Sequence, residues 1–239
     1  MKPNNKNEFL RGMAHGIPIS LGYLSVSFGF GILAFKLGLS AFTASVISAT
    51  NLTSAGQAMG VNVIAAGGTL LEMALVQIVI NMRYSLMALS LSQKLHPSFT
   101  TGHRLAASYG ITDEIFAVCS GQPKPLTPAY MYGMILIAAA GWITGTALGG
   151  VAGEILPDSV SDAMKIVLYS MFIAIVVPPA RKDRRVLAVV IAAAALSTLF
   201  RYVLTFVSDG FAVIICAAAA AAFGAALFPH EEETEEVEA

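Results

Sequence analysis

The sequence predicts an all-α fold: a polytopic integral membrane helical bundle of about six full spans, with two broken or re-entrant helical segments. Composition is the first observation behind this fold class. Of the 239 residues, 56% are hydrophobic and 12% are charged, about half of the ~25% charged residues usual in soluble domains. The second observation is a succession of long apolar runs, most of them near the ~20 residues that cross a bilayer core. We therefore expect the chain to lie in a lipid bilayer.

Eight apolar runs define the expected organisation, and six of them are predicted to be full spans. We expect one transmembrane transporter domain over residues 16–228, a cytoplasmic segment over 1–15 and an acidic, disordered tail over 229–239. With a net charge of −1, nothing suggests a nucleic-acid partner, and the absence of Cys/His metal spacing predicts no cofactor or metal. The runs are 16–35, 41–66, 67–92, 105–121, 127–151, 163–177, 186–207 and 211–228.

Two of these runs are unusual for simple spans. Run 41–66 is rich in Ser, Thr, Asn and Gln, and run 105–121 is short with an acidic pair near its middle. Broken or re-entrant helices explain both, since irregular backbone at membrane depth needs protein or water to satisfy its polar groups. Two regular helices with polar faces packed inward are the alternative. If both runs are re-entrant, the positive-inside rule places Lys94, Arg104, Lys124 and both termini in the cytoplasm.

The run 67–92 carries polar residues that a simple span should not contain. A charge near the bilayer centre costs at least ~2.5–3.5 kcal/mol, so such residues face a bundle interior, a partner or a water-filled path. At helical spacing Gln77, Asn81 and Tyr84 form one polar stripe. Glu72 and Arg83 share a second direction but lie ~16 Å apart, so each is expected to pair with another segment. Hydrogen bonding that simply holds helices together is the alternative for all five residues.

Two further motifs are candidates for chemistry. Around Ser54, Gly56 and Gln57, small residues leave free amides and carbonyls of the kind that bind an amino acid's carboxylate or ammonium group at broken-helix ends; Gly/Ser helix packing is the alternative. Asp113 and Glu114 are adjacent carboxylates, which suit proton coupling, an ion pair with Arg83 or Arg104, or a helix cap.

These motifs give two expected sets of site residues, together with an apolar pocket near Met59 and Met82. For proton coupling or ion pairing they are Glu72, Arg83, Asp113 and Glu114. For substrate binding they are Ser54, Gly56, Gln57, Gln77, Asn81 and Tyr84. A possible internal repeat is also indicated, because residues 81–84 (NMRY) are echoed by residues 199–202 (LFRY).

Three of these motifs, residues 54–57 (SAGQ), 81–84 (NMRY) and 112–114 (TDE), resemble the AzlC (YgaZ) family in content, order and spacing. The resemblance covers roughly residues 10–228. It implies the large subunit of a bacterial branched-chain amino acid exporter in the cell inner membrane, working with a small AzlD (YgaH)-like membrane subunit. One departure is that Ser54 stands where the family usually has a longer side chain, with Gln57 directly after Gly56.

The expected function is therefore a secondary transporter that exports branched-chain or related hydrophobic amino acids. A neutral zwitterion needs donors for its carboxylate, acceptors for its ammonium group and an apolar pocket for its side chain. The alternative is a passive channel or facilitator for small neutral solutes, since Gly-rich helices with polar re-entrant segments also describe pores. An enzyme is not expected, because no nucleophile–base pair or metal-ligand set occurs at useful spacing.

Overall fold

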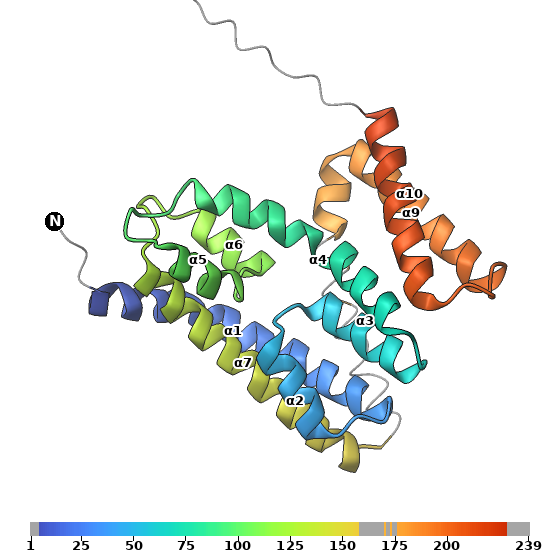
Figure 1. Cartoon of the computed structure of the whole chain (residues 1–239), viewed down its shortest axis with the longest axis horizontal. Helices are drawn as coiled ribbons and strands as arrows, with labels where there is room; N and C mark the ends of the chain where they lie inside the picture. The colour runs from blue at the N-terminus through green and yellow to red at the C-terminus, as the bar shows by residue number, and fades with distance from the viewer. Residues whose placement is uncertain (1–4, 158–169, 171–172, 174–175, 229–239) are drawn as a thin grey trace, which may run out of the picture. The chain divides into compact units, whose positions relative to one another are not determined.

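The computed structural model describes residues 5–157, 170, 173 and 176–228, and the chain divides into two compact units, Met1–Met171 and Phe172–Ala239. The described residues are mostly helical and contain no β-strand (Figure 1). In the first unit the helices are α1 (Asn5–Lys36), α2 (Ala41–Thr50), α3 (Ser54–Ala65), α4 (Leu70–Ser92), α5 (Thr101–Ser108), α6 (Asp113–Ser120) and α7 (Pro128–Ile155). The second unit has α9 (Arg184–Tyr202) and α10 (Asp209–Leu227).

Within the described part of the chain, five helices are long and apolar enough to cross a membrane, namely α1, α4, α7, α9 and α10. They confirm the all-helical, polytopic class. The sixth expected span, 163–177, falls largely outside the described residues. Helix α1 already begins at Asn5, so residues that were expected to form a separate cytoplasmic segment are part of a 32-residue helix.

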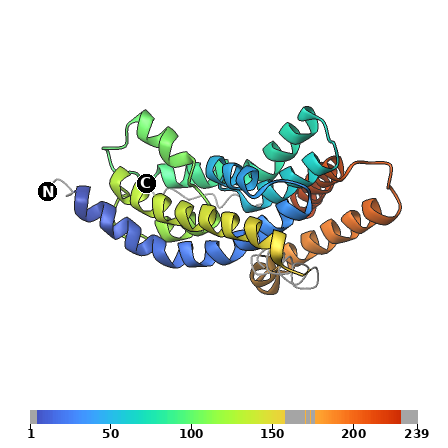
Figure 2. The ribbon, with the colours of Figure 1, turned by 90° about the horizontal axis from the view of Figure 1, so that it is seen from below.

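Helices α1 and α7 form a parallel pair that runs along one side of the first unit (Figures 1 and 2). Gly12 near the start of α1 lies against Tyr130 near the start of α7, and Phe28 late in α1 lies against Gly149 late in α7. A Cβ atom on either glycine would overlap the opposing backbone, so these glycines permit the close approach. Because the two helices run in the same direction, the pair has an N-terminal end, where both helices begin, and a C-terminal end, where both finish.

The first interrupted segment, α2/α3, is a hairpin that enters from the C-terminal end of this pair. Helix α2 begins with Ala41 against Gly150, and the Ser48 hydroxyl lies 2.7 Å from that of Thr146 further into α7. The helix breaks at residues 51–53. Helix α3 then turns back along α4, with which it packs in antiparallel fashion.

Helix α4 returns the chain to the N-terminal end. Immediately after it, Leu95 forms an isolated bridge with Leu126, the residue that comes just before the N-cap of α7. His96 N–H also donates to the Leu126 carbonyl at 2.8 Å. Lys94 therefore lies at the same end as the start of α1, as the re-entrant interpretation of α2/α3 requires.

The second interrupted segment, α5/α6, is a hairpin that enters from the N-terminal end. His103 in α5 hydrogen-bonds to Tyr132 early in α7 at 2.7 Å, and Gly110 packs on Ile135 one turn deeper. The chain breaks at residues 109–112, and α6 returns until the carbonyl of Ser120 accepts a hydrogen bond from Lys94. The two predicted interruptions are thus present, and they approach the middle of α1 and α7 from opposite ends.

The second unit contains an antiparallel pair, α9 and α10, in which Gly224 late in α10 packs against Val189 early in α9. The echoed residues 199–202 close α9, where the Tyr202 side chain is 79% exposed. Residues 81–84 lie well inside α4 instead. The two sequence echoes therefore do not occupy equivalent structural positions.

Candidate substrate site between two half-helices

A small, largely enclosed cavity lies where the two hairpin tips meet. It combines an aromatic and aliphatic wall with hydroxyl and carboxylate groups, and its room is that of about one water molecule. Every element that reaches the middle of the unit contributes to it. The lining residues are Tyr23 from α1, Leu52 and Ser54 from the α2/α3 tip, Tyr84 from α4, Thr112, Asp113 and Glu114 from the α5/α6 tip, and Trp142 from α7.

The predicted polar stripe of α4 faces the start of α3. Thr53 is the N-cap of α3: its hydroxyl accepts from Gly56 N–H at 3.1 Å and donates to Asn81 Oδ1 at 2.7 Å. Asn81 Nδ2 donates to Gln77 Oε1 at 3.0 Å, and Gln77 Nε2 donates to the Gly56 carbonyl at 2.8 Å. The stripe therefore fixes the α3 tip, and Tyr84, one turn further on, reaches the cavity.

Ser54 is the first residue of α3, and it lines the cavity. Its hydroxyl makes no hydrogen bond to other described residues. Helix geometry also leaves the N–H groups of the first turn without intrahelical acceptors. The N-terminus of α3, which is the positive end of its helix dipole, therefore lies at the cavity with backbone N–H donors available.

Arg83 and Asp113 join α4 to the start of α6. Arg83 Nη2 lies 2.9 Å from Asp113 Oδ2, and both side chains are partly exposed, at 36% and 27%. The same nitrogen donates to the Tyr84 hydroxyl at 3.2 Å, with the guanidinium carbon 5.0 Å from that ring's centre. Arg83 Nε is buried with no hydrogen-bond partner among the described residues. The expectation that Arg83 pairs with another segment is confirmed.

Tyr23 ties the α6 tip to α1, and its role was missed by sequence reasoning. Its hydroxyl oxygen lies 2.6 Å from both Thr112 Oγ1 and Glu114 Oε2. Thr112 is the N-cap of α6 and also accepts from Ile115 N–H at 3.4 Å. The only signal in the sequence was a tyrosine in mid-span, since a buried Tyr hydroxyl needs a partner.

Gln57 lies apart from the cavity in a buried network. Its side chain is 2% exposed; its Nε2 donates to Ser48 Oγ at 2.9 Å and its Oε1 accepts from Trp142 Nε1 at 2.9 Å. Ser48 in turn contacts Thr146, whose hydroxyl donates to the Trp142 carbonyl at 3.0 Å. The network joins α2, α3 and α7, so in this conformation the Gln57 amide supports the fold beside the site.

Glu72 is also outside the cavity. It occupies the first turn of α4, where its N–H donates to the hydroxyl of the N-cap Thr69 at 3.1 Å. A Thr-x-x-Glu sequence at a helix start is typical of a capping box. The methionines expected to form an apolar pocket, Met59 and Met82, do not line the cavity, whose apolar wall includes Leu52 and Trp142.

The family profile described as "AzlC protein" matches residues 18–156. The chain belongs to the AzlC family. The match includes both hairpins, α4 and every residue of the cavity. In the part of this AzlC-family chain that the structure describes, no group of three or more His, Cys, Asp or Glu side chains is placed to hold a metal ion.

Relatives of the AzlC-family chain span most of its length. An uncharacterized membrane protein of Archaeoglobus fulgidus is 31% identical over 172 residues, which cover 71% of this chain and 75% of that protein. Inner membrane protein YgaZ of Escherichia coli is 25% identical over 201 residues, 80% and 82% of the two chains. Branched-chain amino acid transport protein AzlC of Bacillus subtilis is 21% identical over 180 residues, 74% and 70%. No solved structure gives a significant match.

Proposed function

We propose that this AzlC-family protein is a secondary transporter that exports branched-chain or related hydrophobic amino acids across the cytoplasmic membrane. The observation that carries the proposal is the meeting of two half-helix N-termini, those of α3 and α6, at one cavity in mid-unit. Discontinuous helices of this kind form the substrate sites of many transporters. The printed name of the Bacillus subtilis relative supports the class of substrate.

The cavity lining offers each group that a neutral amino acid needs. The first-turn N–H groups of α3 and the Ser54 hydroxyl are donors for a carboxylate. The orphaned Nε of Arg83, the partner of the lining residue Asp113, is a further donor beside the lining. Asp113 and Glu114 are acceptors for an ammonium group. Leu52, with the neighbouring aromatic rings, supplies apolar surface for an aliphatic side chain.

Binding requires the cavity to open, because an amino acid is several times larger than a water molecule. The α6 tip is the element we propose to move, since it is held by the Arg83–Asp113 ion pair and the Tyr23–Glu114 hydrogen bond. Protonation of one carboxylate on substrate exchange would weaken these bonds, and this is the proposed coupling to protons. Gly56 and Asn81 hold the α3 tip, and Gln77 and Gln57 support it.

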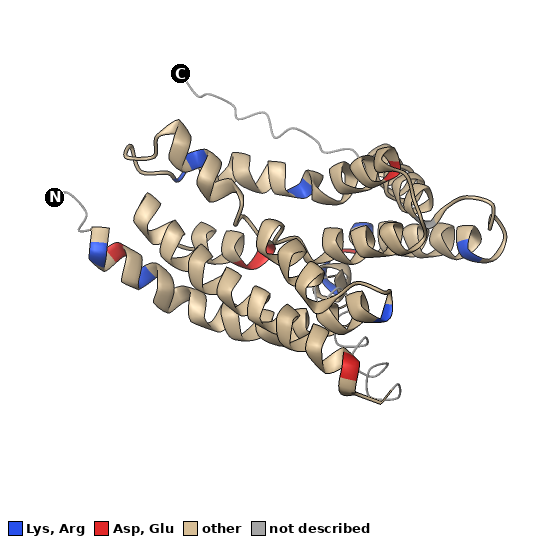
Figure 3. Ribbon diagram, turned by 60° about the horizontal axis from the view of Figure 1, so that its bottom comes forward, with Lys and Arg blue, Asp and Glu red and all other residues tan. Residues whose placement is uncertain are grey.

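The proposed orientation places the N-terminal end of the α1/α7 pair, and both chain termini, in the cytoplasm. Basic residues follow the N-terminus in the first turns of α1 (Figure 3), and five cations of the first unit lie at this end of the pair, as the positive-inside rule requires of a cytoplasmic face. A small AzlD-like membrane subunit is proposed as a partner on the basis of the family resemblance. The cations are Lys6, Arg11, Lys94, Arg104 and Lys124.

The deciding experiment is transport by the full chain in proteoliposomes, with and without the small subunit. We expect counterflow of labelled leucine, valine and methionine, no counterflow of lysine, and uphill accumulation under an imposed proton gradient. Accumulation that never exceeds equilibrium would identify a passive facilitator. If D113N and E114Q together leave the pH dependence of transport unchanged, proton coupling through these carboxylates is wrong.

A further inference from the structure

A second pocket lies at the N-terminal end of the first unit, between the last turns of α4, helix α5 and the first turns of α7. It shares no lining residue with the cavity at the hairpin tips and has a volume of about 270 Å³. Its walls are strongly apolar, built from Leu91, Leu95, Phe99, Ile111 and Met131. A pocket of this kind accepts a hydrocarbon chain.

One cation stands on the rim of this apolar pocket. Arg104 is the only charged residue among the described lining residues, and no carboxylate lies there to neutralise it. Its guanidinium makes no hydrogen bond or ion pair with the described residues. Beside it on α5, the Leu105 side chain is 71% exposed. Helix α5 therefore presents an unpaired cation and an exposed aliphatic side chain next to an apolar hollow.

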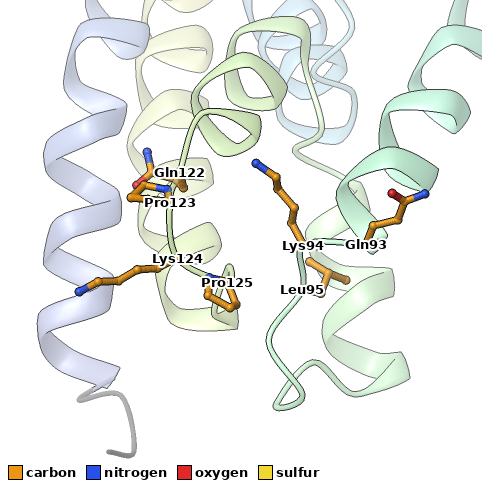
Figure 4. A pocket seen from close by; sticks show the side chains of 7 residues that line it. All are labelled: Gln93, Lys94, Leu95, Gln122, Pro123, Lys124 and Pro125. Atoms are coloured by element: carbon orange, nitrogen blue, oxygen red, sulfur yellow. The ribbon is translucent and has the colours of Figure 1, made fainter.

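The surroundings of the pocket extend this positive character. Leu95 also lines a neighbouring depression, together with Lys94 and Lys124 (Figure 4). Lys94 reaches across to the end of α6, where it donates to the Ser120 carbonyl, whereas Lys124 points away from the gap on the far side of its loop. Among the described residues that line the two hollows, none is acidic. The complementary ligand has an anionic head and an apolar tail.

We propose that this pocket binds one acyl chain of an anionic phospholipid, with the lipid phosphate held by Arg104. A guanidinium binds phosphate through paired hydrogen bonds, and an unpaired arginine beside a hydrocarbon-lined pocket matches both halves of such a lipid. Basic pockets between transmembrane helices on the cytoplasmic side are known to hold lipid head groups. The site is independent of the proposed substrate and direction of transport.

The test measures lipid binding to the full chain in detergent, by native mass spectrometry and by the shift of the unfolding temperature on lipid addition. The probes are phosphatidylglycerol and phosphatidylcholine with identical acyl chains. We expect phosphatidylglycerol to bind more tightly, and R104Q to weaken it by about tenfold, the equivalent of one charge-assisted contact. K36Q removes the same charge from the last residue of α1, at the other end of the pair, and should change nothing.

A second pair of variants tests the acyl-chain half of the proposal. A88F fills the pocket from α4, whereas A74F places the same ring on the exposed face of that helix outside the pocket. Loss of phosphatidylglycerol binding in A88F but not in A74F supports the site. The proposal is overturned if the two lipids bind equally, if R104Q and K36Q have equal effects, or if A88F leaves binding unchanged. If inorganic phosphate raises the unfolding temperature as much as the lipid does, no acyl chain is bound.

Discussion

The two hairpins of the first unit share a backbone plan but hold their tips with different kinds of bonds. Each consists of two short helices that enter from one end of the α1/α7 pair, break near its middle and return. Their helix starts recur at a nearly constant interval. The corresponding N-caps lie 60, 59 and 58 residues apart: Ser40 and Thr100, Thr53 and Thr112, Thr69 and Thr127.

The difference lies in charge and burial. The α2/α3 tip is held by neutral hydrogen bonds, including those of the buried Gln57. The α5/α6 tip is held by the carboxylates of Asp113 and Glu114, the first of which is partly exposed. Neutral buried networks are expensive to open, while partly exposed ion pairs exchange readily with water. We therefore expect α2/α3 to form a fixed wall and α5/α6 to act as the moving gate.

The largest expected effect concerns the fixed wall. Gln57→Ala should lower the free energy of unfolding by about 3 kcal/mol, because it strands the Trp142 indole N–H in a buried site and leaves the Ser48 hydroxyl with Thr146 as its remaining partner. Denaturant unfolding in detergent measures this. Asn62→Ala is the matched control on α3, since that amide bonds only to the Ala58 carbonyl of its own helix. If Q57A matches the control in stability but raises the KM for leucine, Gln57 is a substrate ligand instead.

The next effect concerns the gate. Asp113→Asn should slow leucine transport by about tenfold, the equivalent of ~1.4 kcal/mol in the activation barrier. It should lower the free energy of unfolding by less than about 1 kcal/mol, because the Arg83–Asp113 ion pair is partly exposed. Initial rates and unfolding curves on the same preparations separate the two. Exchanging the charges in R83D/D113R should recover part of the rate. A stability loss as large as that of Q57A would make this tip a second fixed wall.

A smaller effect is expected where α1 meets the gate. Tyr23→Phe removes the hydroxyl shared by Thr112 and Glu114 and should cost about 1 kcal/mol of stability, together with a change in transport rate. Tyr132→Phe is the control, because it removes a similar bond, to His103, in the α5 arm rather than at the tip. Equal transport rates in the two variants would show that Tyr23 has no part in gating.

Local chemistry explains which parts of this picture could be predicted from sequence. Polar residues inside apolar runs marked both breaks, and helical spacing placed Gln77, Asn81 and Tyr84 on one face. Arg83 needed a partner elsewhere, and Asp113 was among the candidates. These inferences need only the composition and periodicity of a single segment.

Other contacts could not be predicted from the sequence, for equally physical reasons. The partner of Gln57 is Trp142, 85 residues away, and no local pattern indicates that an amide and an indole will meet. Glu72 lies within the candidate span Leu70–Ser92, in its first turn, and the capping-box spacing of Thr69 and Glu72 was the local signal that sequence reasoning did not use. Tyr23 gave a weak signal because its partners lie on a hairpin whose depth depends on tertiary packing.

The smallest expected difference tests whether the hairpins are equivalent at all. Thr53 and Thr112 both cap the inner half-helix, and each hydroxyl has one further partner, Asn81 and Tyr23 respectively. Replacing either with alanine should cost about 1–2 kcal/mol, and the two losses should agree within about 0.5 kcal/mol, the usual scatter for distant sites.

Thr→Ser at each position keeps the hydroxyl and should retain most of the stability. The transport rates, in contrast, should separate the two alanine variants, because only Thr112 belongs to the proposed gate. Equal stability losses with unequal rates would mean that one backbone plan supports two roles, and that the charges at positions 113 and 114 make the difference. Unequal stability losses would mean that the near-constant N-cap spacing does not mark an equivalent pair of hairpins.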